Sequence, residues 1–343
     1  MNPVERVVRV ADRWQQRHTS TAFLFGVIKK YGDDNAGQMA SSLAYTAFVS
    51  LFPLLLVLTT LLGIVAAGNP GLRHTIIHAV AGQFPVISHQ LQHNVHQLRR
   101  ASYIGLVVGL VAALWGSSGL AQSGIYTMVH VWNVPGPDRP GYFQRLGRAG
   151  LFLLVLAVGV GVTALLTSFG GFASGTPWLT VLADGLAGLA NIGMYLVGYR
   201  VLTPKSVPFR RLVPGAILAG IGWTILLAAG AALVRHYLHS DSVYGIFAIV
   251  LSLVAWIYLV VEVTIYAAEV NVVLARRLWP RSIVQPPLTE ADRQALALFP
   301  LAERRRDEQQ VAVTYTDQPD ETTKERGVAD ADGAATRTAD HQA

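Results

Sequence analysis

The chain has 343 residues, of which 52% are hydrophobic and only 14% are charged, whereas soluble domains average about 25% charged residues. It contains no cysteine, so disulfides and thiolate metal sites are excluded. The net charge of +6 is uneven: residues 1–302 carry 21 basic and 11 acidic side chains, and residues 303–343 carry 6 and 10.

Long stretches without charge indicate an integral membrane protein. No Asp, Glu, Lys or Arg occurs between residues 34 and 73, 100 and 138, or 148 and 184, and about 20 apolar residues suffice for a membrane-spanning helix. The expected fold is all-α and polytopic, with six transmembrane helices. Their approximate positions are 42–67, 103–131, 148–170, 178–201, 213–234 and 243–270.

The distribution of Lys and Arg predicts the orientation of these helices. With a cytoplasmic N-terminus, the cytoplasmic segments hold 17 basic residues and the outer segments hold four. Because basic residues accumulate on the cytoplasmic side, both termini are predicted to be cytoplasmic. The basic body favours anionic lipid headgroups over nucleic acid as its partner.

The cytoplasmic N-terminal segment, residues 1–34, is predicted to begin with an interfacial amphipathic helix over residues 4–17. One stripe of that helix is apolar, and arginines occupy the other side. The apolar stripe comprises Val4, Val7, Val8, Ala11 and Trp14, and the arginines are Arg6, Arg9, Arg13 and Arg17. A lipid sensor and a simple anchor on the inner leaflet are both consistent with this pattern.

The first span contains Pro53, which cannot donate a hydrogen bond to the carbonyl of Val49 and is expected to kink the helix. Polar residues lead up to it, and they are interpreted either as a hinge in a transport path or as packing through interhelical hydrogen bonds. The candidate path or hinge residues are Gln38, Ser42, Tyr45, Ser50, Pro53, Gln122 and Asn133.

The outer loop over residues 68–102 is predicted to be amphipathic, with His89, His93 and His96 on one helical face. Such a face suits zinc, a pH sensor or a solvated polar surface. The loop holds no Asp or Glu to orient the imidazoles, so no metal site and no cofactor are predicted.

Small residues at helical spacing predict close helix packing in two spans. The glycines concerned are Gly105, Gly109, Gly119, Gly215 and Gly222.

Two acids, Glu262 and Glu269, lie two turns apart in the last span. At about 1.5 Å per residue, a helix that starts near residue 243 has crossed the ~30 Å hydrocarbon core by Glu262. We expect Glu262 to be a solvated boundary residue. We expect Glu269 to form a structural or gating ion pair with the loop between spans four and five, whose basic residues are Arg200, Lys205, Arg210 and Arg211.

The remaining segment, residues 281–343, is predicted to be a cytoplasmic and mostly disordered tail. It has few large apolar groups to join a core, although the stretch "QPPLTEADRQALALFP" is expected to hold one short helix.

Five segments resemble the YihY/BrkB family of bacterial inner-membrane proteins in the same order along the chain. They read "SSLAYTAFVSLFPLLLVL", "VWN", "LVPGAILAGIGW", "SVYGIFAIVLSLVAWIYL" and "AAEVN". The resemblance covers residues 30–280, the six-helix domain being placed at 35–280. It implies six helices with both ends in the cytoplasm of a bacterium, and a role in envelope integrity. Within "AAEVN", Glu269 matches the family's acid, and Ala267 stands where glycine is usual.

We expect a transporter or flippase-like protein that moves a lipid or another amphiphile across the bacterial cytoplasmic membrane. The alternative is a non-transporting envelope scaffold. The family is sometimes labelled a ribonuclease. Metal-dependent hydrolysis of RNA needs clustered carboxylates or histidines, and this sequence has no such cluster. No catalytic residues and no enzymatic activity are therefore predicted.

Overall fold

The computed structural model describes residues 3–66, 103–172, 177–237 and 245–315. These residues are mostly helical and contain no strand. The chain divides into two units, Met1–Asp307 and Glu308–Ala343. The all-α class is confirmed.

Six long helices lie at the six predicted spans. They are α3 (Ala36–Ala66), α6 (Tyr103–Val131), α7 (Tyr142–Phe172), α8 (Pro177–Leu202), α9 (Val213–Tyr237) and α10 (Gly245–Arg276). Among the described residues, four stretches are long and apolar enough to cross a membrane, namely Tyr142–Thr167, Trp178–Leu202, Phe209–Ala231 and Phe247–Arg276. Crossing by α3 and α6, and the cytoplasmic placement of both termini, remain predictions.

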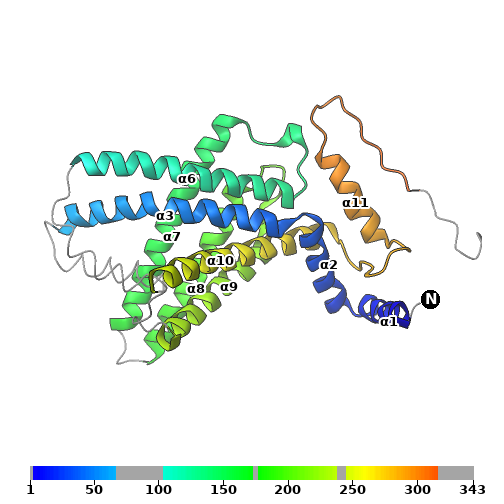
Figure 1. The fold of residues 1–343 in the computed structure, drawn as a ribbon, viewed down its shortest axis with the longest axis horizontal. Helices are drawn as coiled ribbons and strands as arrows, with labels where there is room; N and C mark the ends of the chain where they lie inside the picture. Colours follow the sequence, from blue (N-terminus) through cyan, green and yellow to red (C-terminus); the bar gives the residue numbers. More distant parts are fainter. Residues whose placement is uncertain (1–2, 67–102, 173–176, 238–244, 316–343) are drawn as a thin grey trace, which may run out of the picture. The chain divides into compact units, whose positions relative to one another are not determined.

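The last long helix, α10, closes the bundle (Figure 1). Each long helix packs against the next one in the chain, and α10 returns to pack against α3. It also contacts α6, the short helix α2 (Thr19–Asp33) and the 3-10 helix η4 (Phe209–Leu212). Residues of α10 therefore meet side chains from both the beginning and the middle of the chain.

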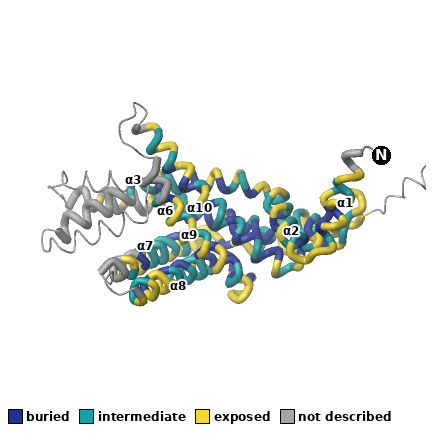
Figure 2. Tube along the Cα trace, turned by 90° about the horizontal axis from the view of Figure 1, so that it is seen from below, coloured by how far each residue is buried: buried dark blue, intermediate teal, exposed yellow. Residues whose placement is uncertain are grey.

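The core lies toward the C-terminal end of α10. Its most deeply buried members include Ala40 on α3, Met128 on α6 and Ile265 on α10, and Figure 2 shows buried segments where α10 approaches α2. Large apolar side chains such as Val107 and Phe247 are exposed along the opposite halves of the helices. Exposed apolar surface of this extent is typical of helices that face lipid.

The first helix, α1 (Pro3–Arg17), turns its apolar stripe outward. Val7 and Trp14 are exposed, whereas Asp12 is buried and accepts a hydrogen bond of 3.0 Å from the backbone N–H of Ile283. Docking through the polar side leaves the apolar stripe free for a membrane surface. This arrangement is consistent with the predicted interfacial helix, whether it acts as an anchor or as a sensor.

The first part of the segment from residue 281 onward contains the short helix expected there. Asp292 lies fully buried at the start of α11 (Glu290–Ala302) and pairs with Lys29 and Arg281, each at 2.9 Å. Arg281 is buried as well, and it also bonds Asp33 at 2.6 Å. Buried ion pairs tie this segment to α2, and Ala295 of α11 also joins the hydrophobic core. A search for apolar groups does not detect the ion pairs.

Acid should release α11 through Asp292. Burial alone would raise the pKa of Asp292, but hydrogen bonds from Ser282 and Lys29 outweigh it and hold the pKa well below its usual range. A carboxylate with a depressed folded-state pKa stabilises the protein above its unfolded pKa of about 3.9, and this contribution is lost as the pH falls toward the folded value. The midpoint temperature of thermal unfolding should therefore fall as the pH drops below ~4. This fall should be smaller in Asp292→Asn than in the exposed control Asp307→Asn.

Truncations should separate the two units. Removing residues 308–343 deletes only the second unit, so the thermal midpoint of the purified protein is expected to stay unchanged. Removing residues 281–343 also deletes Arg281 and Asp292, and this truncation should lower the thermal midpoint. Equal midpoints for the two truncations would contradict the account of this segment.

Candidate functional site

A cluster of buried charges surrounds Glu269 near the C-terminal end of α10. Oε2 of Glu269 lies 3.7 Å from Nζ of Lys30, and both side chains are fully buried. The same ammonium forms an ion pair with Asp34 and donates to the carbonyl of Val131 at 3.3 Å, at the end of α6. We call Lys30, Asp34 and Glu269 the Lys30 cluster.

Local sequence explains two members of this cluster. Lys30 and Asp34 are four residues apart, the spacing at which side chains on a helix meet, and Asp34 caps the C-terminus of α2. Asn35 follows with a positive φ of 52°, a conformation that Asn tolerates better than most residues. The chain thereby turns from α2 into α3 immediately beside the cluster.

Several polar atoms of the cluster lack a hydrogen bond. Within the described part of the chain, neither carboxylate oxygen of Glu269 has a hydrogen-bond partner, nor has Oδ1 of Asp34. The charged neighbours of Glu269 are Lys30 and Asp34. Arg276 lies at the rim, where its guanidinium donates to the carbonyl of Trp132 at 2.6 Å. The cluster thus encloses two acids and one lysine.

Asn271, two residues beyond Glu269, ties α10 to the start of α9. Its Oδ1 accepts from the backbone N–H of Gly215 at 2.6 Å, and its Nδ2 donates to the carbonyl of Leu212 at 3.3 Å. A Cβ on Gly215 would collide with Asn271 and with the carbonyl of Ala267. The "AAEVN" segment therefore joins α10 to α2 through its acid and to α9 through its amide.

The predicted partner of Glu269 differs from the one in the structure. Arg200 donates to the carbonyl of Val207 within its own loop, at 3.0 Å. The side chains of Lys205, Arg210 and Arg211 are exposed. The cation next to Glu269 is instead Lys30, which lies 239 positions earlier in the chain. Spacing cannot reveal such a distant pairing, although adjacent lysines and aspartates in "KKYGDD" marked a charged helix end.

Glu262 lies apart from the Lys30 cluster. It is half-buried and accepts a hydrogen bond of 3.4 Å from the hydroxyl of Tyr31, whose ring stacks on Tyr266. Burial and the charge of Glu262 raise the pKa of Tyr31, so this hydroxyl stays a neutral donor. The two acids of α10 therefore have different surroundings, and the solvated boundary position of Glu262 stays a prediction.

The candidate path residues do not converge on one site. Gln38, Ser42 and Tyr45 are exposed on α3. Ser50 is buried, and its hydroxyl donates to the carbonyl of Gly116 on α6 at 2.8 Å.

The other two polar candidates lie on or just after α6. Gln122 is half-buried on this helix, and Asn133 is buried just beyond its end.

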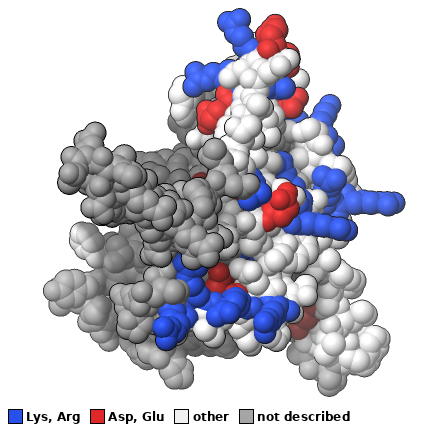
Figure 3. All heavy atoms as spheres, turned by 90° about the vertical axis from the view of Figure 1, so that its right-hand side faces the viewer, with Lys and Arg blue, Asp and Glu red and all other residues white. Residues whose placement is uncertain are grey.

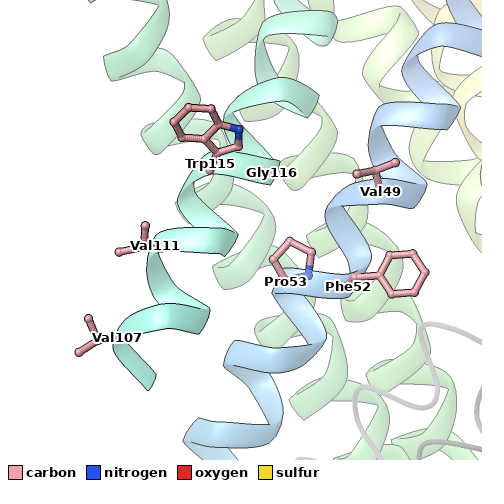
Figure 4. A pocket seen from close by; sticks show the side chains of 7 residues that line it. All are labelled: Val49, Phe52, Pro53, Val107, Val111, Trp115 and Gly116. Carbon is pink, nitrogen blue, oxygen red and sulfur yellow. The ribbon is translucent and has the colours of Figure 1, made fainter. Parts of the chain in front are cut away.

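An apolar groove lies between α3 and α6 beside Pro53. Its volume is about 700 Å³. Figure 4 shows its lining: Val49, Phe52 and Pro53 from α3, and Val107, Val111, Trp115 and Gly116 from α6.

The two helices come close at one point of this groove. A Cβ on Gly116 would lie 3.0 Å from Cγ of Pro53. Because α3 continues as one helix through Pro53, the kink remains a prediction.

The glycines singled out for packing behave differently from one another. Gly215 lies against α10, as does Gly222, where a Cβ would be 2.6 Å from Cγ1 of Val263. Among the described residues, nothing lies within 4 Å of a Cβ built on Gly119, so close packing at this position stays a prediction. Gly105 and Gly109 belong to α6, but their surroundings lie outside the described residues.

The histidine face at residues 89, 93 and 96 also lies outside the described residues, as does the whole loop over 68–102. Among the residues that are described, no group of three His, Cys, Asp or Glu side chains could hold a metal ion.

Comparison with known proteins identifies the family. The family described as virulence factor BrkB matches residues 27–289. The chain belongs to this family. The matched range contains the whole Lys30 cluster and the helices α3 to α10, whereas α1 and α11 lie outside it. This result confirms the resemblance seen in the sequence.

Relatives in the BrkB family include proteins of several bacteria. A UPF0761 membrane protein of Alteromonas mediterranea is 27% identical over 265 residues, which are 72% of this chain and 85% of that protein. The putative ribonuclease-like protein YfkH of Bacillus subtilis is 25% identical over 271 residues, 75% of this chain and 96% of that protein. No solved structure matches. The family and the apolar helices together show a membrane protein.

Proposed function

We propose that this BrkB-family protein is a flippase-like transporter that moves a lipid or another amphiphile across the bacterial cytoplasmic membrane in support of envelope integrity. The observation that carries the proposal is a stripe along α3. Its members recur every three or four residues, the spacing of one helical face, and all are exposed: Gln38, Ser42, Tyr45, Val49 and Phe52.

The stripe changes from polar to apolar along its length. Gln38, Ser42 and Tyr45 offer hydrogen-bonding groups, whereas Val49 and Phe52 line the groove against α6. An amphiphile has the same division between a polar head and an apolar chain. The groove suits an acyl chain, since its lining is apolar, and the polar end of the stripe suits a headgroup.

The alternative is a non-transporting scaffold of the envelope. It is supported by a second groove, on α8, that is also lined by apolar side chains, including Trp178 and Leu186. It is also supported by the Lys and Arg side chains on the face that carries α1, α2 and α11 (Figure 3). Such a face suits anionic lipids or a partner. We propose no enzymatic activity, no cofactor and no nucleic-acid partner for either function.

Reconstitution tests the two functions against each other. The purified protein is placed in vesicles that carry a fluorescent phospholipid, and an impermeant quencher reports the outer-leaflet fraction over time. Transport predicts that lipid from the inner leaflet becomes quenchable faster than in protein-free vesicles. Equal rates in both preparations would favour the scaffold.

A further inference from the structure

The carboxylate of Glu269 is buried without the partners that an ionised acid needs. Its two oxygens accept no hydrogen bond from any residue that the structure describes, and Nζ of Lys30, at 3.7 Å, lies beyond hydrogen-bond distance. An ionised carboxylate in such surroundings is strongly disfavoured. A neutral carboxyl group avoids most of this cost and gains an O–H donor.

Lys30 is already committed to other acceptors. Its ammonium pairs with Asp34 and also donates to the carbonyl of Val131. One lysine balances the charge of one carboxylate. Of the two acids in the cluster, Asp34 lies much closer to Lys30 than Glu269 does. Glu269 is therefore the acid left over, while Oδ1 of Asp34 remains an acceptor without a donor.

Other charged groups around the cluster have different partners or positions. Arg276, on α10, donates to Trp132, and its charged neighbours are Arg211 of η4 and Asp34. On α2, Tyr31 bonds Glu262, and on α6, the His130 ring bonds the carbonyl of Tyr126. Tyr45 on α3 is exposed.

We propose that Glu269 binds an exchangeable proton and donates it in a hydrogen bond to Oδ1 of Asp34. The ligand of the Lys30 cluster is thus a proton, held between α2 and α10. Release of the proton leaves the buried carboxylate of Glu269 ionised and without a hydrogen bond beside the ion pair of Lys30 and Asp34, so the contact between α2 and α10 must loosen or admit water. The site thereby links protonation to the position of α2.

Infrared spectroscopy of the protein in lipid nanodiscs tests the proposal directly. At neutral pH, the spectrum should contain the carbonyl stretch of a protonated carboxyl group. This band should disappear in Glu269→Gln and persist in the matched control Glu262→Gln, which changes the other acid of the same helix. Absence of the band from the unmodified protein, or its persistence in Glu269→Gln, would overturn the proposal.

Stability provides a second readout. Gln keeps an N–H donor for Asp34, so Glu269→Gln should fold, and its thermal midpoint at neutral pH should equal or exceed that of the unmodified protein. Because only the folded state holds this proton above the unfolded pKa of a glutamate, about 4.3, the unmodified protein should lose stability more steeply than Glu269→Gln as the pH rises above that value. A variant that fails to fold would show that the ionised acid is required, against the proposal.

Proton coupling of transport is a further step, and it rests on the proposed function. In the vesicle assay, a pH gradient should change the lipid-transport rate of the unmodified protein but not that of Glu269→Gln. Insensitivity of the unmodified protein would reject coupling. Absence of transport would reject the proposed function, while the infrared result would decide the proton site by itself.

Discussion

Replacing Lys30 with methionine should lower the free energy of unfolding by about 3 kcal/mol or more, because removal of one partner leaves a buried carboxylate without its counter-charge. Asp34 is that carboxylate: its side chain is almost fully buried and pairs with Lys30. Methionine retains most of the apolar stem, so the loss reports the ammonium group. Equilibrium denaturation in a mild detergent measures it.

Two further variants make the Lys30 result specific. Lys205→Met removes an exposed lysine and should change stability little. The double variant Lys30→Met with Asp34→Asn removes both charges and should recover part of the loss, since neither charge is then left unpaired. A loss for Lys205→Met as large as that for Lys30→Met would contradict the assigned pair.

Gly215→Ala should destabilise the contact between α9 and α10 by about 1–3 kcal/mol, the usual range for overpacking. The added Cβ would collide with the carbonyl of Ala267 and the side chain of Asn271. The hydrogen bond that Asn271 accepts from the Gly215 N–H would be strained as well. The thermal midpoint should fall, and helix α9 should become more sensitive to protease at its start.

Gly193→Ala is the matched control for this change. Gly193 lies inside α8, and a Cβ there would meet nothing within 4 Å. Because alanine favours helix more than glycine does, this variant should be neutral or slightly stabilising. Equal losses at both positions would mean that packing against α10 is not the cause.

The positions of the six long helices were predictable because a membrane span leaves a strong local signal. A charge-free apolar run must form a helix, since no other open structure satisfies its backbone in lipid. Each of the six predicted ranges overlaps one long helix of the structure.

Pairing between distant residues was not predictable in the same way. An acid in an apolar run marked Glu269 as unusual, but nearby loop arginines were the partners that the sequence indicated. The structure instead brings Lys30 to it, because α2 packs against α10. Hydropathy predicts which residues enter the membrane and does not predict which helices become neighbours.

The segment after α10 shows a second limit. Apolar content correctly indicated one short helix, and the structure places α11 there. The same criterion misjudged the anchoring of the segment, because Arg281 and Asp292 hold it through buried ion pairs. Charged residues ordinarily mark exposed chain, so their burial is visible only when their partners are known.

The proposed function requires an amphiphile to move along the exposed stripe of α3 and through the groove against α6. Val111→Trp places an indole in this groove, whereas Val158→Trp makes the same change at an exposed valine of α7. The decisive measurement is the rate of phospholipid movement in reconstituted vesicles for these two variants. The account predicts that Val111→Trp loses most of the protein-dependent rate and that Val158→Trp retains it. Equal rates for the two variants would contradict the account.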